Sequence, residues 1–178
     1  RADGEYLYMS VRAVPIMGTD GSIVEWVGLH TDIDQRKRAE QRLRLLDTMT
    51  QAARAADDPA AIMDVTTRLL GEHMGVTRCP YAVVEPDNDR FAILHNYIVP
   101  GAISTVGVYS LDLFGTRAVS DMRAGHTLTI RDVDKELLDF DGAEMFNAIE
   151  CKAIICCPLV KEGRLVAMMA VHQDCPRN

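Results

Sequence analysis

The chain has 178 residues, a formal net charge of −7 and a hydrophobic content of 48%. This length allows one domain or two small ones, and the composition suits a globular protein. The acidic balance argues against nucleic acid as a main partner. The sequence has no run of about 18 apolar residues, so we expect no membrane-spanning helix in it.

Residues 1–34 predict a β-hairpin. Residues 5–17 alternate polar and apolar side chains as a strand does, residues 18–21 (Gly-Thr-Asp-Gly) form a turn, and residues 22–31 return as a second strand. Two strands alone cannot bury a core. We therefore expect the hairpin to be the end of a domain whose first part is missing, and the chain to be a fragment of a longer protein.

Residues 35–56 predict a long helix, because they contain neither Gly nor Pro and consist mostly of good helix formers. Asp32 or Asp34 can cap its first turn. The side chains of a possible pairing stripe follow one another at the four-three spacing of a short parallel helix pair. They are Ala39, Leu43 and Leu46. We expect this stripe to form a homodimer with the same helix of a second chain; the alternative is that the helix packs only on its own domain.

The same helix carries a basic run, since residues 36–44 contain five basic side chains and one acidic one. Such a run can bind a phosphate backbone. Here the run is short and lies in an acidic chain, so a solvated helix face is the preferred interpretation. We therefore expect no nucleic-acid site.

Residues 57–178 predict a second, mixed unit. Asp58 can cap a helix that has Pro59 in its first position, and Gly75 can end that helix. The elements expected after it are, in order, strands at 78–85 and 91–99, an irregular segment at 100–115, a helix at 116–124, a strand at 126–131, an acidic loop at 132–141, a helix at 143–149, and strands at 152–160 and 164–172.

The last two strands are apolar on both faces, as residues 153–157 and 165–171 show. A sheet built from such strands must be covered on both sides. We predict an α+β fold in which an antiparallel sheet carries helices on one face and loops with short helices on the other. The second face could enclose a pocket.

Five side chains are candidates for the lining of that pocket. They are His95, Tyr97, Tyr109, Phe114 and His172. By simple alternation along the second strand of this unit, His95 and Tyr97 share a face with Phe91 and Ile93. If the five converge, they form aromatic walls with a few polar groups, which a small-molecule site needs. The alternative is that the aromatic side chains only fill the core.

The five cysteines carry no recognisable chemistry. They are Cys79, Cys151, Cys156, Cys157 and Cys175. An odd number without regular spacing indicates reduced thiols in the cytosol, so we expect a cytoplasmic protein with buried, apolar thiols. No CxxC pair exists, and adjacent strand residues such as Cys156 and Cys157 point to opposite faces, so we expect no structural zinc. No local signature pairs a cysteine with a histidine, and no catalytic site is predicted.

The first part of the chain resembles the C-terminal half of a PAS domain. The resemblance rests on Asp3-Gly4-Glu5, Ala13-Val14-Pro15-Ile16, Asp20-Gly21, Gly28 and Thr31-Asp32-Ile33 running into Arg-Ala-Glu. Asp34 stands where the family usually has Thr or Ser, although Asp also caps helices. The resemblance implies that the following helix carries a signal to the next module.

The second part resembles a GAF domain. The most specific stretch is Cys157-Pro158-Leu159-Val160 through Gly163-Arg164-Leu165-Val166-Ala167 to Ala170-Val171-His172, followed by Pro176-Arg177. The family normally adds a final helix, which is missing here. The resemblances imply a PAS tail at 1–34, a signalling helix at 35–56 that is also the first GAF helix, and a GAF domain at 57–178.

A PAS tail followed by a GAF domain, together with residues 106–115, resembles the input region of a bacterial sensor histidine kinase. The resemblance implies a dimeric signal-transduction protein of a two-component phosphorelay, in which a small ligand or a partner shifts the packing of the helices. The kinase chemistry itself is expected beyond residue 178. Alternatives are a structural or dimerisation module that binds no ligand, and the input region of a diguanylate cyclase or phosphodiesterase.

No motif identifies a cofactor. The chain has no Walker loop and no GxGxxG sequence. It also lacks the Asn-Lys…Phe…Asp-Glu pattern of cyclic-nucleotide-binding GAF domains and the Asp-Ile-Pro motif of bilin-binding ones. His172 stands where phytochromes have a strand histidine, but this ending also occurs in GAF domains without a chromophore. We therefore expect neither a covalent bilin nor a cyclic nucleotide.

Overall fold

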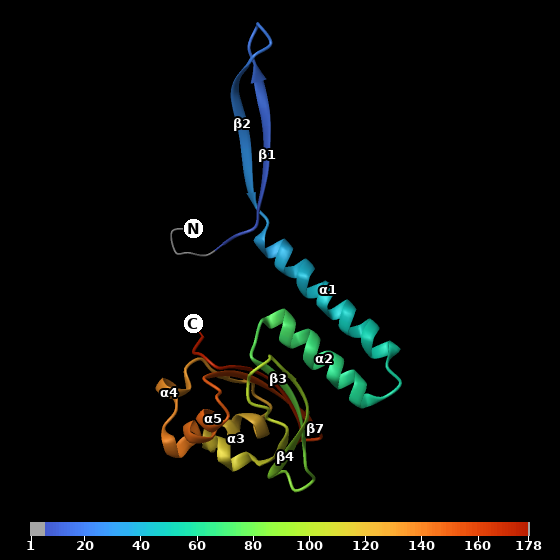
Figure 1. Ribbon diagram of the computed structural model, residues 1–178, viewed down its shortest axis with the longest axis vertical. Helices are drawn as coiled ribbons and strands as arrows, with labels where there is room; N and C mark the ends of the chain where they lie inside the picture. The colour runs from blue at the N-terminus through green and yellow to red at the C-terminus, as the bar shows by residue number, and fades with distance from the viewer. Residues whose placement is uncertain (1–5, 178) are drawn as a thin grey trace. The chain divides into compact units, whose positions relative to one another are not determined.

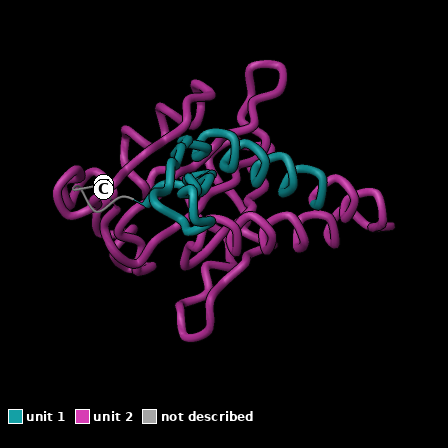
Figure 2. The backbone as a smooth tube through the Cα atoms, turned by 90° about the horizontal axis from the view of Figure 1, so that it is seen from above, with its two compact units in different colours: residues 1–48 teal, residues 49–178 magenta. Residues whose placement is uncertain are grey.

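The computed structural model describes residues 6–177 and forms two compact units, residues 1–48 and residues 49–178 (Figure 2). The boundary between the units falls within α1 (Asp34–Ala55). Among the described residues, no helix is both long and apolar enough to cross a membrane.

The first unit begins with the predicted hairpin, in which β1 (Met9–Met17) pairs with β2 (Ile23–Asp32) in antiparallel fashion. Its turn closes where Gly18 N donates to Ser22 O at 2.7 Å. Both faces of the hairpin are open, and Trp26 and Leu29 are 60% and 67% exposed. The hairpin therefore buries little of its apolar surface within this unit.

Helix α1 starts with the capping that its sequence predicts. The Asp32 carboxylate accepts a hydrogen bond from Asp34 N at 2.9 Å. The basic run is solvated and partly paired along the helix, since Arg38 lies 2.6 Å from Asp34 and Arg44 lies 2.6 Å from Glu40. The Arg44–Glu40 pair is exposed, and such pairs contribute about 0.3–0.5 kcal/mol, so this one supports the helix only weakly.

The second unit begins with α2 (Pro59–Met74), whose ends follow from its sequence. The Asp58 carboxylate accepts from Ala60 N at 3.1 Å, and Pro59 occupies the first helical position. Gly75 ends the helix in the left-handed conformation at φ 58°, which a glycine adopts without steric cost.

In the part of the chain that the structure describes, six strands of this unit form one antiparallel sheet in the order β5-β4-β3-β8-β7-β6. The strands are β3 (Arg78–Val84), β4 (Arg90–Ile98), β5 (Gly107–Ser110), β6 (Leu128–Ile130), β7 (Ala153–Lys161) and β8 (Arg164–Gln173). The predicted α+β class with an antiparallel sheet is confirmed. Strand β5 lies in the segment expected to be irregular, and it forms because it pairs with residues 90–93 of β4.

Both faces of the sheet are covered, as predicted (Figure 1). Helix α2 packs on one face against β3 and β4. The short elements on the other face are η1 (Leu111–Phe114), α3 (Gly115–Ala124), α4 (Val133–Glu136), η2 (Asp139–Asp141) and α5 (Ala143–Ala148). The acidic segment expected to be a loop therefore contains two short helices.

Helix α2 approaches β4 closely because one of its residues has no side chain. A Cβ on Gly71 would overlap the ring of Tyr97. The missing side chain therefore leaves the room that the tyrosine ring fills. About two turns earlier in the same helix, Asp64 Oδ1 lies 2.6 Å from Nδ1 of His95.

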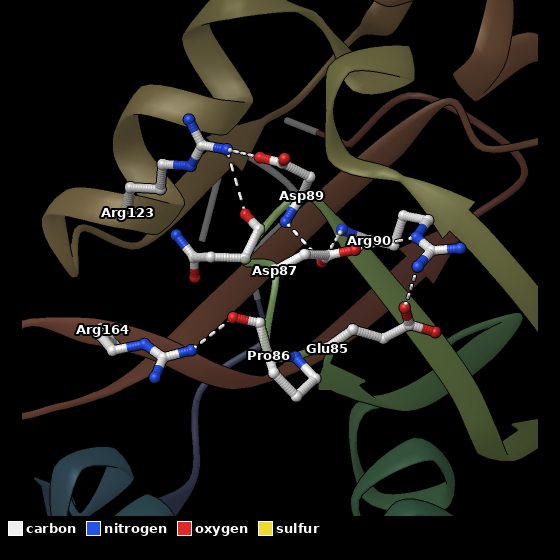
Figure 3. Close-up of polar contacts among 8 residues, drawn as sticks. Glu85, Pro86, Asp87, Asp89, Arg90, Arg123 and Arg164 are labelled. Atoms are coloured by element: carbon white, nitrogen blue, oxygen red, sulfur yellow. Dashed lines mark hydrogen bonds and ion pairs between the residues drawn. The ribbon is translucent and has the colours of Figure 1, made fainter.

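On the opposite face, α3 is tied to the turn between β3 and β4 (Figure 3). Arg123 of α3 donates from Nη2 to Asn88 O at 3.0 Å and to Asp89 Oδ1 at 2.8 Å. Arg164 of β8 donates to Pro86 O at 2.6 Å from the other side of the turn. The turn thus ties α3 to the end of the strands β3 and β4.

Two glycines bring the start of α3 and the start of α5 together. A Cβ on Gly115 would overlap the backbone of Asp141, and a Cβ on Gly142 would overlap the backbone of Phe114. Both glycines have positive φ, at 87° and 95°. Thr116 N then donates to the Asp141 carboxylate at 2.8 Å. This two-glycine contact fixes the helices that cover the second face.

Candidate functional site

A cavity of about 70 Å³ lies between the sheet and the elements η1, α3 and α5, on the face that α2 does not cover. Its walls are almost entirely apolar. The side chains that the site description below uses are Phe91, Thr105, Tyr109, Phe114, Phe146 and His172. The volume holds more than one water molecule, because a single water needs about 10–15 Å³.

Four aromatic rings form one side of the cavity. Phe91 stacks on Tyr109 with ring centroids 5.6 Å apart, and Phe114 lies 5.6 Å from Phe91. Phe114 meets Phe146 edge to face at 5.2 Å. The Tyr109 hydroxyl donates to Thr105 O at 3.0 Å, which turns the phenol toward the loop and leaves the ring in the wall.

The cavity has one polar end, which Thr105 and His172 line. His172 of β8 pairs directly with Arg78 of β3, so the two side chains share the cavity face of the sheet. The Arg78 guanidinium is completely buried and donates to two carbonyl oxygens, Ile103 O at 3.0 Å and Glu150 O at 2.8 Å. These bonds clamp the loop before β5 and the end of α5 onto the sheet.

Several polar atoms of His172 and of the residues next to the lining, Arg78 and Asn96, have no hydrogen-bond partner. Nε of Arg78, Nδ1 of His172 and Oδ1 of Asn96 are buried and unpartnered. Burial, followed by the charge of Arg78, lowers the pKa of His172 to about 3, so the imidazole is neutral at neutral pH. A neutral imidazole offers one donor and one acceptor. Buried polar groups are normally paired, so this end of the cavity has unused capacity for hydrogen bonds.

The structure brings together three of the five predicted pocket residues. Tyr109, Phe114 and His172 line the cavity. His95 and Tyr97 lie on the opposite face, where His95 meets Asp64 of α2 and the Tyr97 ring fits against Gly71. The expectation that His95 and Tyr97 share a face with Phe91 and Ile93 is therefore wrong.

A β-bulge in β4 explains the difference. Tyr81 of β3 pairs with His95, and the next residue, Ala82, pairs with Ile93, so Leu94 is an extra residue in β4. An extra residue reverses the alternation of side chains along the strand. Phe91 and Ile93, which precede Leu94, therefore face the cavity. His95 and Tyr97, which follow it, face α2.

Apart from His172, the residues at and beside the polar end are not predicted from the sequence. Arg78 and Thr105 are fully buried, and Asn96 donates from Nδ2 to the Thr105 hydroxyl at 3.2 Å. One sequence signal for this end of the cavity is Arg78, a single charged residue at the start of an otherwise apolar strand, directly before Cys79 and Pro80. A charged residue at a strand end is usually solvated, so that signal is weak.

The cysteines divide into two groups. Cys79, Cys151 and Cys156 are buried, and burial raises the pKa of each thiol to about 12, so all three are inert thiols as expected. Cys157 and Cys175 are exposed, which corrects the expectation that all five are buried. Within residues 6–177, no three His, Cys, Asp or Glu side chains are grouped as a metal site requires.

The predicted pairing stripe of α1 lies on the surface of its unit. Ala39 is exposed, and Leu43 and Leu46 are 67% and 50% exposed. The geometry leaves the stripe accessible, and dimerisation through it stays a prediction.

Comparison with known proteins identifies the second unit. The family model of the GAF domain matches residues 58–178. No curated protein matches the chain. A solved phycocyanobilin-bound GAF domain from a cyanobacterial phytochrome is 18% identical, with a TM-score of 0.66 over 78% of this chain and 82% of that one.

Two further solved structures come from proteins of other kinds. The GAF domain of an Acinetobacter phosphoenolpyruvate-protein phosphotransferase is 13% identical, with a TM-score of 0.56 over 78% of this chain and 80% of that one. Free methionine-R-sulfoxide reductase from Neisseria meningitidis, solved with its substrate, is 18% identical, with a TM-score of 0.58 over 79% and 77%. At such low identities these similarities show a shared fold alone.

Proposed function

We propose that this chain, which belongs to the GAF domain family, is a sensory module that binds a small molecule in the cavity between its sheet and α3 and α5. The observation that carries the proposal is the cavity itself, with aromatic walls and one polar end. Ligand sites in proteins combine an apolar lining with a few placed polar groups, and this cavity has both.

We further propose that the module is the input region of a cytoplasmic sensor histidine kinase, with the hairpin as a PAS tail. The support is the resemblance of residues 3–40 to the end of a PAS domain and the succession of the two modules. In this proposal α1 is the dimeric helix through which the signal is transmitted. A ligand that binds one packing of the helices better than another shifts the population toward it.

Native mass spectrometry of the purified protein, with an absorbance spectrum of the same sample, tests the ligand proposal. We expect a reproducible mass above that of the bare chain, and the visible spectrum then identifies or excludes a coloured group. A clean mass that also stays unchanged after incubation with a library of small metabolites contradicts the proposal. That result would favour the second candidate function, a structural module that binds no ligand. The small cavity volume supports this candidate, because pockets for drug-sized ligands span about 300–1,000 Å³.

The dimer proposal makes a separate prediction for α1. Replacing Leu43 and Leu46 together with Asp is expected to reduce the mass in solution from that of two chains to that of one, because two charges then enter an apolar helix pair. Multi-angle light scattering measures the mass. Gln41→Asp is the control, since this exposed residue lies on the face of the helix opposite the stripe, and it is expected to leave the dimer intact. An unchanged mass in the double variant removes this helix as the interface.

A further inference from the structure

The buried charge of Arg78 is the feature that remains unexplained. A guanidinium stays protonated in proteins, and a buried charge normally has a counter-charge. Here the side chain is fully buried, and its contacts within residues 6–177 are the carbonyls of Ile103 and Glu150. The carbonyl bonds offset part of the desolvation but leave the positive charge without a negative partner.

Unpartnered atoms lie at the polar end of the cavity and beside it, because Arg78 does not itself line the cavity but pairs with His172, which does. Its own Nε and His172 Nδ1 are buried without a partner, and His172 lines the cavity. The Thr105 hydroxyl accepts from Asn96 Nδ2 and keeps its own hydrogen for donation. The Asn96 amide can also be turned, so that its carbonyl accepts from Thr105 and its NH₂ group becomes the unpartnered one. The polar end can thus supply several donors to one acceptor group.

The size of the cavity limits what can reach these donors. A volume of about 70 Å³ has room for several water molecules, since one needs about 10–15 Å³ of such space, but not for a drug-sized ligand. The rest of the lining is apolar and aromatic. A short alkyl body with one charged head fits these limits, whereas a second polar group would lie against aromatic rings.

We propose that the cavity binds a short-chain carboxylate, with its alkyl body among the aromatic rings and its carboxylate at the polar end beside Thr105 and His172, where the charge of Arg78 balances it. This inference rests on the proposed function, because it names the ligand class of the same cavity. It also assigns Arg78 a role in recognition besides its structural contacts with Ile103 and Glu150.

Propionate and propionamide test the charge of the head group on the unmodified protein, since the two molecules have nearly the same size and shape. Each is titrated at constant ionic strength while protein-detected NMR follows the signals of the cavity. We expect saturable shifts of cavity residues with both, at a dissociation constant at least tenfold lower for propionate. Equal or tighter binding of propionamide overturns the carboxylate assignment.

Variants then test which residues recognise the head group. Arg78→Gln is expected to abolish the preference for propionate, so that the dissociation constants of propionate and propionamide become about equal. Because that variant also loses contacts that hold the fold, Thr105→Val provides a second test with nearly the same side-chain shape, and it is expected to weaken propionate at least threefold. Thr129→Val, the same substitution at an exposed position of β6, is the control and is expected to leave both constants unchanged. Unaltered propionate binding in Thr105→Val contradicts the placement of the carboxylate.

The outcomes separate this inference from the function on which it rests. If propionamide shifts the cavity signals as well as propionate does, the cavity binds small molecules but does not select a carboxylate, and the inference alone fails. If neither molecule shifts them, the inference fails. The ligand-binding function fails with it only if native mass spectrometry also detects no bound species.

Discussion

Replacing Phe146 with alanine is expected to lower the free energy of unfolding by about 3–5 kcal/mol, because a buried aromatic side chain is lost and a larger cavity is left. Phe146 is 1% exposed and joins the aromatic cluster through Phe114. Since natural domains have a total stability of about 5–15 kcal/mol, this is a large share of it. Urea titration followed by circular dichroism measures the change.

Phe140→Ala is the matched control for that variant. Phe140 is 87% exposed, so the same chemical change is expected to stay within about 0.5 kcal/mol of the unmodified protein. The Phe146 variant also has a larger apolar cavity, which a molecule such as benzene can fill. We expect saturating benzene to restore part of the lost stability. Similar losses in the two phenylalanine variants would show that the core is not built as described.

Gly142→Ala is expected to destabilise the protein through two separate costs. The positive φ of 95° costs an alanine about 1–2 kcal/mol, and the overlap of its Cβ with the backbone of Phe114 adds about 1–3 kcal/mol of overpacking. The melting temperature and the urea midpoint are both expected to fall. The NMR signals of α3 and α5 are expected to change most, because the two-glycine contact joins these two helices.

Gly163→Ala separates the two costs. Gly163 has a φ of 74°, and nothing lies within 4 Å of the position that its Cβ would take. This variant therefore carries the conformational cost without the overlap, and it is expected to lose clearly less stability than Gly142→Ala. Equal losses would mean that the close approach between the two loops has no energetic weight.

The elements of this fold follow well from local signals. The cap at Asp58, the proline at the first helical position and the glycine at 75 predict α2 to within a residue or two, because each acts on the backbone beside it. Strand β5 was not predicted. Its segment is rich in Gly and Ser, and it becomes a strand only because β4 offers an edge to pair with. Such pairing is a tertiary event that local propensity does not contain.

The site residues also divide into those that local signals identify and those that depend on tertiary contacts. Tyr109, Phe114 and His172 could be named from the sequence, since aromatic residues in an irregular segment and a histidine at a strand end indicate a lining. Arg78 could not, because its burial depends on carbonyls from two distant segments. His95 was assigned to the wrong face, because alternation assumes a regular strand and carries no sign of an inserted residue.

The extra residue Leu94 makes one point of β4 tolerant of a change in length. Ile93 and His95 already pair with consecutive residues of β3, Ala82 and Tyr81, and they lie on opposite faces of the sheet. Deleting Leu94 would therefore remove the bulge and leave Ile93 facing the cavity and His95 and Tyr97 facing α2. Related chains with and without this residue can thus keep the same cavity lining, and an alignment of their sequences needs a gap of one residue at this point.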